Sequence, residues 1–207
     1  MKLKKVLFMK AGGIILSGGK SSRMGTNKAF LKINQKPNIE RVKNELEKLV
    51  DDIILVSNDP EEYQFLNIKT VTDDFPGKGP LAGIHAGLKA SSSQANLVVA
   101  CDMPFVSAKL GSILLNQASD YDAVIPVING RQQMLFAVYQ KGILEEIEKC
   151  IEGNNLSIKH VLDSFNVCYL TEEELHDYSS GSLNRIFFNM NSPEEYEHAK
   201  KWAETEE

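Results

Sequence analysis

The chain has 207 residues, of which 43% are hydrophobic and 25% are charged. This balance is typical of a globular protein with a real core and excludes a disordered or collagen-like chain. With 23 Lys and Arg against 28 Asp and Glu, the net charge is −5, which argues against a general nucleic-acid-binding protein because such proteins usually carry a basic excess.

Short apolar runs alternate along the chain with stretches of helical periodicity. Because nearly continuous apolar strands that alternate with helices indicate a mostly parallel sheet covered on both faces, we expect an α/β fold. Strands are expected at residues 14–16, 53–56, 70–72, 97–100, 123–126, 135–139, 167–170 and 186–188, and helices at 38–50, 80–90, 107–117, 143–151, 158–162 and 193–202. Two helix starts are marked by caps, Ser107 for the third helix and Ser192-Pro193 for the last.

The cysteines and the apolar runs bear on the compartment. Cys101, Cys150 and Cys168 are widely spaced and form no CxxC pair, which argues against a disulfide framework and a structural zinc site. No apolar run approaches the roughly 20 residues of a membrane span. The apolar run at residues 6–9 is too short for the core of a signal peptide. We therefore expect a cytoplasmic protein with no membrane contact.

The loop after the first strand is a candidate phosphate-binding loop. It contains Gly18 and Gly19, followed by basic residues that include Arg23 and Lys28. Glycines let backbone N–H groups approach phosphate oxygens, and basic side chains neutralise phosphate charge. A P-loop is excluded because its first glycine would fall on Ile14, and the GxGxxG spacing is also absent. A glycine-rich turn with solvated lysines is the alternative interpretation.

Acidic residues follow two later strands. Residues 73–83 (DDFPGKGPLAG) place two carboxylates before a Pro/Gly turn and a helix start. A carboxylate there can accept hydrogen bonds from a base or ribose, and a solvated surface turn explains the pattern equally well. Asp102 ends the apolar run at residues 98–100, where a Mg²⁺ ligand is expected. Helix capping is the alternative for Asp102, and the neighbouring Cys101 fits a small buried residue.

The run from Leu16 to Lys28, LSGGKSSRMGTNK, resembles the LxGGxSxRMGxxK nucleotide-binding loop of the molybdenum cofactor guanylyltransferases. That family belongs to a wider group of nucleotidyltransferases with a Rossmann-like fold. The chain departs from the pattern at Ser17, where alanine is usual, and at Asn27, where aspartate is frequent. The acidic segments resemble the D-x-F/Y-P-G-x-GPLAG and C-D-x-P segments of the same family. The resemblance covers nearly the whole chain and is strongest over residues 16–104.

The resemblance implies a fold and a set of site residues. The fold is a three-layer α/β/α Rossmann-like fold with a mostly parallel central sheet. One nucleotidyltransferase domain would cover residues 1–207, with an N-terminal extension at 1–11, a nucleotide half at about 12–120 and a cofactor half at about 121–207. The implied nucleotide-binding residues are Leu16, Ser17, Gly18, Gly19, Lys28, Asp73 and Asp102, with Asp73 preferred to Asp74; Arg23, Lys28 and Asp102 would be catalytic, and Asp102 would bind Mg²⁺.

The second half carries weaker signals. Arg131 lies beside two amides in a turn that resembles a family segment ending in PLFAVY, although Met134 replaces its proline. These groups suit an anionic ligand such as a pterin phosphate, and a hairpin with a solvated arginine is the alternative. Asn191 belongs to a closing NMNSPE segment that also resembles the family. It would contact substrate or metal, or alternatively cap the last helix.

The resemblance implies transfer of GMP from GTP to the phosphate of the molybdenum–molybdopterin cofactor, with release of pyrophosphate. GTP and the molybdopterin-type cofactor would be the small-molecule substrates, and a molybdoenzyme or a cofactor-delivery protein would be a further partner. Two alternatives stay open. One is a sister enzyme that uses CTP or another phosphate acceptor, although the Gly18-Gly19 pair favours guanine. The other is a degenerate, non-catalytic nucleotide-binding adapter.

Overall fold

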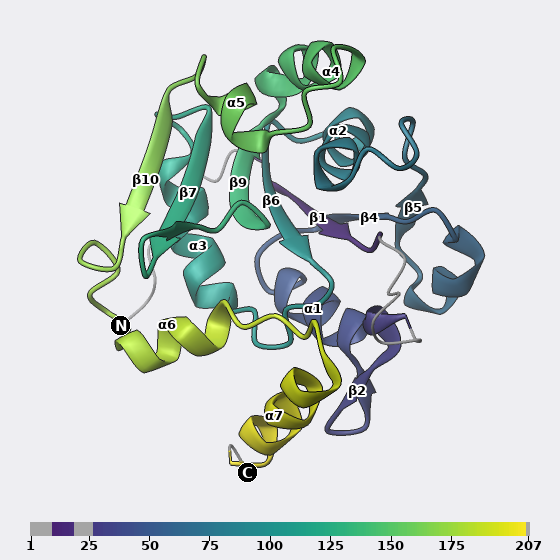
Figure 1. Ribbon diagram of the computed structural model, residues 1–207, viewed down its shortest axis with the longest axis vertical. Coiled ribbons are helices and arrows are strands. Elements are labelled where there is room, and N and C mark those ends of the chain that lie inside the picture. The colour runs from purple at the N-terminus through teal and green to yellow at the C-terminus, as the bar shows by residue number, and fades with distance from the viewer. Residues whose placement is uncertain (1–9, 19–26, 206–207) are drawn as a thin grey trace.

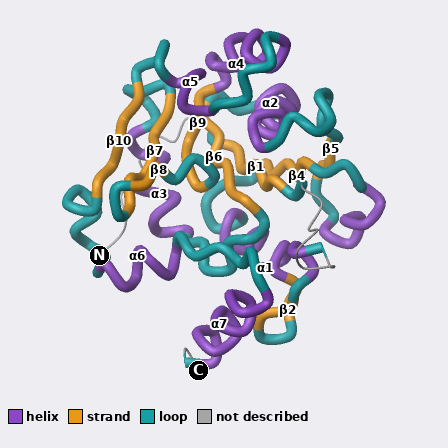
Figure 2. The backbone as a smooth tube through the Cα atoms, viewed as in Figure 1, coloured by secondary structure: helices purple, strands orange, loops and turns teal. Residues whose placement is uncertain are grey.

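The computed structural model describes residues 10–18 and 27–205, and the elements are shown in Figures 1 and 2. The strands are β1 (Gly12–Leu16), β2 (Lys32–Ile33), β3 (Lys36–Pro37), β4 (Asp52–Val56), β5 (Lys69–Val71), β6 (Ala95–Ala100), β7 (Ala123–Ile128), β8 (Arg131–Gln132), β9 (Phe136–Gln140) and β10 (Val167–Thr171). The α-helices are α1 (Asn38–Leu46), α2 (Pro80–Ala90), α3 (Ala108–Gln117), α4 (Leu144–Glu152), α5 (Ile158–Leu162), α6 (Ser180–Ile186) and α7 (Pro193–Glu204). Short 3₁₀ helices lie at Lys28–Phe30, Pro60–Leu66 and Lys141–Ile143.

One sheet of eight strands organises the molecule, in the order β10-β7-β9-β6-β1-β4-β5 with β8 paired to β7 (Figure 1). Strands β6, β1, β4 and β5 run parallel to one another, and β10 is parallel to β7. Strand β9 is antiparallel to both β6 and β7. Since β6 and β7 are each antiparallel to β9, their carboxyl ends reach the same edge of the sheet. The mostly parallel α/β fold expected from the sequence is confirmed.

The two faces of the sheet are covered by different helices, as the alternation along β1 requires. Ile15 packs with residues of α1, α3 and α6 in one buried cluster. Ile14 and Leu16 point the opposite way and pack with α2, α4 and α5 in a second cluster. Helix α2 lies so close to β1 that a Cβ atom on Gly87 would stand 2.5 Å from Cγ2 of Ile14. The fold therefore has three layers, helix–sheet–helix.

A small third core lies outside these layers, where α7 packs beside the β2–β3 hairpin (Figure 1). Its fully buried members include Ile33, Met190 and Ala199. Met190 also donates its backbone N–H to the carbonyl oxygen of Asp102, at 2.9 Å. The C-terminal segment is thus fixed against the carboxyl end of β6.

Most elements expected from the sequence are present, and one expectation was wrong. Residues 186–188 were expected to form a strand, but Ile186 is the last residue of α6 and Phe187 lies in its C-cap. The apolar residues there pack as a helix end, because Ile186 and Phe187 are buried against the same core as Phe136. The cap expectations are confirmed: the Ser107 side chain accepts from Leu110 N, and Ser192 forms a capping box with Glu195.

Among the described residues, no helix is both long enough and apolar enough to cross a membrane.

Candidate active site

The site lies at the carboxyl ends of β1 and β6, where the chain order of the strands reverses about β1. In open α/β sheets, ligands bind in the crevice at such a switch point. Strand β1 ends at Leu16, in register with Ala100 of β6 and Val56 of β4. Backbone hydrogen bonds extend this register past the strands, from Cys101 N to the Leu16 oxygen at 3.0 Å and from Ser17 N to the Val56 oxygen at 2.9 Å. The start of the glycine loop and Asp102 are therefore adjacent.

Three polar side chains from distant parts of the sequence meet at this edge. Lys28 opens the 3₁₀ helix after the glycine loop, Asp102 follows β6, and Asn191 precedes α7. The Lys28 ammonium lies 3.5 Å from Oδ2 of Asp102 and donates to Oδ1 of Asn191 at 2.6 Å. Two oxygen ligands thus converge on one cation. We call Lys28, Asp102 and Asn191 the polar cluster.

Burial sets the electrostatics of the cluster. The Asp102 side chain is 22% exposed, and its desolvation raises the pKa of the carboxyl group, while the nearby Lys28 ammonium partly offsets this rise. Desolvation also raises the pKa of the Cys101 thiol to about 12, with a further contribution from the Asp102 charge. Cys101 is therefore held as a neutral thiol and is a poor nucleophile at neutral pH. Of these two neighbouring groups, the Asp102 carboxyl group is therefore the one that can carry a negative charge.

The cluster is fixed by backbone contacts that leave its side chains available. Asn38, fully buried at the start of α1, donates from Nδ2 to the Cys101 oxygen at 2.6 Å. Helix α3 is capped by Ser107 and helix α7 by Ser192. The capping roles considered for Asp102 and Asn191 are therefore wrong, and both side chains face Lys28 instead.

The glycine loop itself is described only at its two ends. Gly19 and Arg23 lie outside the described residues. A Cβ atom on Gly18 would meet no atom of the described residues within 4 Å. At the far end, Oδ1 of Asn27 caps the 3₁₀ helix by accepting from Ala29 N at 3.1 Å.

The two positions of the glycine loop that depart from the family pattern, Ser17 and Asn27, converge on one hydroxyl group. Ser17 Oγ lies 2.7 Å from the Tyr63 hydroxyl, and Asn27 Nδ2 donates to the same hydroxyl at 2.9 Å. Tyr63 is 1% exposed. Its desolvation raises the pKa of the phenol, so the group is neutral at physiological pH.

The two acids after β5 have different environments. Oδ1 of Asp73 accepts from Phe75 N at 2.7 Å, in a local turn. Asp74 points toward α2 and forms an ion pair with Lys89 at 2.6 Å, and the hydrogen bond from Lys89 lowers the pKa of the Asp74 carboxyl. The loop continues to Gly79, whose φ of 72° is a left-handed conformation that favours glycine and precedes Pro80 of α2. The structure brings neither acid into contact with the polar cluster.

Arg131 lies in the hairpin that joins β7 to β8. The turn is Asn129-Gly130, with φ of 50° and 70°, as a two-residue hairpin turn requires. Asn129 is anchored by its Nδ2 donating to Oδ1 of Asn184 on α6 at 2.6 Å and its backbone N–H donating to Glu172 at 3.1 Å. The Arg131 side chain is exposed. Its hairpin follows β7, so it lies on the same sheet edge as the polar cluster.

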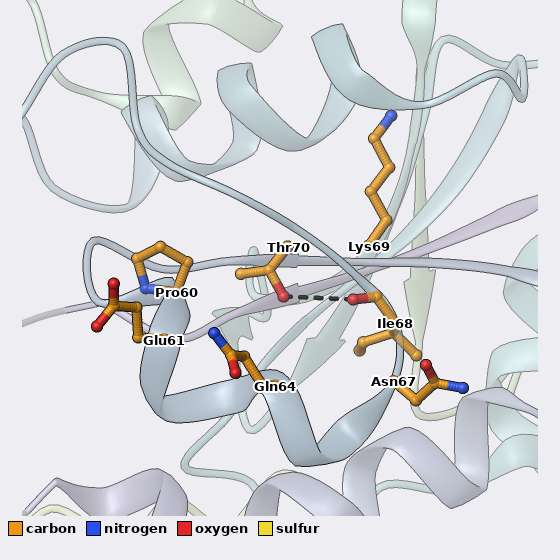
Figure 3. A pocket seen from close by; sticks show the side chains of 7 residues that line it. All are labelled: Pro60, Glu61, Gln64, Asn67, Ile68, Lys69 and Thr70. Carbon is orange, nitrogen blue, oxygen red and sulfur yellow. Dashed lines mark hydrogen bonds between the residues drawn. The ribbon is translucent and has the colours of Figure 1, made fainter.

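A surface pocket of about 590 Å³ lies elsewhere (Figure 3). It flanks β5 and the 3₁₀ helix Pro60–Leu66, and its one basic group, Lys69, points away to donate to the Ala90 oxygen at 2.7 Å. It offers no convergent charges, so we place the site at the polar cluster. The pocket is lined by Pro60, Glu61, Gln64, Asn67, Ile68, Lys69 and Thr70.

Sequence reasoning missed two residues that support the site, Tyr63 and Asn38. Tyr63 belongs to no recognised motif and lies within the 3₁₀ helix Pro60–Leu66, between two polar residues, Glu62 and Gln64. Asn38 stands at a helix start, where asparagine is commonplace. No local signal in the sequence marks either position as buried, although the fold buries both.

These features define a class of protein, a mostly parallel α/β protein with a candidate ligand site at the β1/β6 edge. The chain matches the family model described as MobA-like NTP transferase domain over residues 13–167. It is 35% identical over 196 residues to a probable molybdenum cofactor guanylyltransferase of Pelotomaculum thermopropionicum, covering 95% of each chain. It is also 37% identical to a protein of the same description from Clostridium perfringens, covering 91% of this chain and 96% of that one.

A solved structure has the same fold. The molybdopterin-guanine dinucleotide biosynthesis protein A from Archaeoglobus fulgidus superposes with a TM-score of 0.80 and 26% identity, covering 94% of this chain and 99% of that one. The chain therefore belongs to the MobA-like NTP transferase family, and it is a nucleotidyltransferase. The family resemblance expected from the sequence is confirmed.

Proposed function

We propose that the protein acts in molybdenum cofactor biosynthesis by transferring GMP from GTP to the terminal phosphate of molybdenum–molybdopterin. An oxygen of the acceptor phosphate forms a bond to the α-phosphorus of GTP. The bond between the α-phosphorus and the oxygen that bridges to the β-phosphate breaks, and pyrophosphate leaves. The names of the relatives support the substrates, and the loop Ser17-Gly18-Gly19 supports guanine over cytosine.

One observation carries the proposal: Lys28 and Asp102, 74 positions apart, meet at the switch point of the sheet. Transfer of a nucleotidyl group needs positively charged groups beside the phosphates and no covalent bond to the protein. Lys28 would neutralise the charge that develops on the α-phosphate and on the departing pyrophosphate. We assign the same role to Arg23. Leu16, Ser17, Gly18 and Gly19 would present the backbone that lies along the nucleotide.

The polar cluster fits Mg²⁺. This cation takes oxygen ligands and usually one or two carboxylates, with phosphates and water completing its shell. The Asp102 carboxylate and the Asn191 amide oxygen already share a cation, the Lys28 ammonium. We propose that Asp102 holds the metal ion and that Asn191 faces it or the acceptor. When bound, the ion supplies charge neutralisation on the phosphates.

The remaining predicted residues have distinct places in the proposal. Asp73 would contact the guanosine side, because Asp74 is already paired with Lys89. Arg131, exposed on the same sheet edge, would bind the acceptor phosphate. The whole chain, residues 1–207, would act as one domain, since a single sheet includes strands from both the nucleotide half and the cofactor half. We further propose a cytoplasmic location.

Thermal unfolding with GTP, CTP and ATP, each with and without Mg²⁺, tests the proposal. A ligand at about 100 times its Kd adds roughly 2.7 kcal/mol of stability, which raises the Tm of a domain of this size by about 5–10 °C. We expect this shift with MgGTP and a much smaller one with the other nucleotides. At the same GTP concentration, Lys28→Ala should reduce this shift to about half or less. Lys43→Ala, which removes an ion pair with Glu47 on α1 at 2.7 Å, is the matched control and should retain it.

The other outcomes are informative. A preference for CTP would keep the mechanism and change the product. A chain that binds MgGTP and releases no pyrophosphate with the cofactor supplied would be a nucleotide-binding adapter. If no nucleotide shifts the Tm, the proposed site is wrong.

A further inference from the structure

We infer that Tyr63 is a positioning residue for Lys28. Its hydroxyl group and its ring hold the 3₁₀ helix that begins at Lys28 in a fixed place against the end of β1. The role of Lys28 itself rests on the proposed function, whereas the positioning can be tested without any nucleotide.

The hydroxyl group of Tyr63 joins two segments that the glycine loop separates. It lies 2.7 Å from Ser17 Oγ, directly after β1, and accepts from Asn27 Nδ2 at 2.9 Å. Ser17 is 6% exposed and Tyr63 is 1% exposed, so the bond between them is shielded from water, while the bond from Asn27 is partly buried. A hydrogen bond that excludes water fixes geometry better than one on the surface, because losing either partner leaves a buried polar group unsatisfied. Tyr63 thus sets the distance between Ser17 and Asn27.

Asn27 transmits this restraint to Lys28. Its Oδ1 accepts from Ala29 N at 3.1 Å and so caps the 3₁₀ helix. Its backbone oxygen accepts from Phe30 N at 3.1 Å. The orientation of the amide follows: with Oδ1 at the cap, Nδ2 faces Tyr63. Lys28 is the next residue along the chain, at the start of the helix that Asn27 caps.

The ring of Tyr63 provides a second contact with the same helix. Phe30, its last residue, stacks on Tyr63 with ring centroids 5.1 Å apart and an interplanar angle of 21°. Helix residues on either side of Lys28 are therefore held by one tyrosine, Asn27 by its hydroxyl and Phe30 by its ring. Rotation of the helix, which would move the Lys28 ammonium away from Asp102, breaks at least one of the two contacts.

The donors and acceptors around the Tyr63 hydroxyl indicate which of the two hydroxyl groups, that of Tyr63 or that of Ser17, matters more. Asn27 Nδ2 can only donate, so the Tyr63 oxygen accepts there and the single phenol proton is free for Ser17 Oγ. Removal of the Ser17 hydroxyl leaves the bond between Asn27 and Tyr63 in place. Removal of the Tyr63 hydroxyl breaks its contacts with Asn27 and Ser17 together and leaves Asn27 Nδ2 with only an exposed bond to Glu62 Oε2 at 3.2 Å. Tyr63→Phe should have a larger effect than Ser17→Ala.

The first test measures nucleotide transfer and nucleotide affinity in a double-mutant cycle. We expect Tyr63→Phe to lower kcat/KM at least tenfold, with MgGTP affinity lowered as well, and Ser17→Ala to have a smaller effect. In a Lys28→Ala background, Tyr63→Phe should have almost no further effect, since it acts through Lys28. If Tyr63 had a purely structural role, Tyr63→Phe would still lower the Tm, but it would lower kcat/KM by the same factor in the wild-type and Lys28→Ala backgrounds. Equal fold-changes would overturn the inference.

The second test uses the nucleotide-free protein and does not depend on the proposed function. Tyr63→Phe should speed hydrogen exchange at the amides of Ala29 and Phe30, both bonded to Asn27. The matched control is Tyr139→Phe, which removes a buried hydroxyl that donates to the Met134 oxygen at 2.8 Å and should leave those amides unchanged. Unchanged exchange in Tyr63→Phe would overturn the inference. Faster exchange without MgGTP binding by the wild type would support the positioning and refute the proposed function instead.

Discussion

The two halves of the sheet edge are built differently. At the β1/β6 end, buried groups fix each functional side chain: Tyr63 holds the helix of Lys28, and Asn38 holds the backbone before Asp102. At the β7 end, Arg131 stands exposed on a hairpin whose turn residue, Asn129, is bonded to Asn184 and Glu172. A site that stabilises charge must be rigid before the substrate arrives, because preorganised groups need no reorganisation during the reaction. The first region meets this requirement in the isolated chain, whereas the second leaves its arginine in water.

This difference suggests a division of work along the edge. The rigid region is suited to phosphates of fixed geometry, such as those of a nucleoside triphosphate. The exposed region is suited to a bulky acceptor that must enter and leave. Substitutions at the two ends should therefore affect different kinetic constants.

The largest effect is expected from Asp102→Ala. Loss of the carboxylate should lower metal-dependent transfer at least 100-fold, equivalent to about 2.7 kcal/mol. The variant should still fold. Burial raises the pKa of Asp102 in the folded state, so the free energy of unfolding falls as the pH rises from the unfolded-state pKa through the folded-state pKa. At pH 7 the ionised Asp102 carboxylate therefore destabilises the fold, and its removal should not prevent folding. Steady-state kinetics and the Tm at pH 7 measure both. Wild-type turnover in this variant would contradict the account.

Lys28→Ala should come next and affect the nucleotide. A hydrogen bond to a charged group contributes about 1.5–3 kcal/mol, so MgGTP affinity should fall about 10- to 100-fold, as isothermal titration would measure. The affinity for the acceptor should change little. If Lys28→Ala bound MgGTP as tightly as the Lys43→Ala control, the rigid region would not be the nucleotide site.

Arg131→Ala should have a smaller effect than Lys28→Ala, and it should affect the acceptor instead of the nucleotide. Because the side chain is exposed, its loss should raise the KM for the phosphate acceptor about tenfold, near 1.4 kcal/mol, with MgGTP affinity unchanged. The control is Lys141→Ala, which also removes one positive charge from the second half of the chain. In the wild type, the Lys141 ammonium donates to the Ser91 oxygen at 2.6 Å. An Arg131→Ala variant with weakened MgGTP binding would remove the proposed division of work.

The smallest effect concerns His85, which is 1% exposed on α2 beside Phe75. Burial lowers its pKa below 6.5, partly offset by Glu148. The unfolded chain therefore binds the proton first, and stability should fall as pH drops from about 6.5 toward the lower folded-state pKa. His85→Leu should flatten the Tm between pH 5 and 7, whereas His176→Gln, at an exposed position, should not. Identical pH profiles for His85→Leu and wild type would refute this origin of acid sensitivity.

Much of the fold was predictable from the sequence because its signals are local. The apolar runs and caps located the strands and helices around Asp102 and Lys28, and Ser192-Pro193 marked α7 correctly. The exception, residues 186–188, shows the limit: a short apolar run reads as a strand or as a buried helix end, and only the packing against Phe136 decides.

The candidate site was predictable in part. Motif spacing identified Lys28 and Asp102, and the parallel order of β1 and β6 explains why they meet. The partnership of Lys28 with Asn191 depends on the return of the chain's last segment to the sheet edge, which no local pattern encodes. Tyr63 was missed for the same reason, since its partners lie 46 and 36 positions away.

Following the label from GTP tests guanylyl transfer at the polar cluster. With GTP labelled at the α-phosphate, we expect the label to enter the molybdopterin product. With GTP labelled at the γ-phosphate, the label should appear only in pyrophosphate. Both transfers should be lost in Asp102→Ala. Label from the γ-phosphate in the acceptor, or transfer that persists in Asp102→Ala, would contradict guanylyl transfer at the polar cluster.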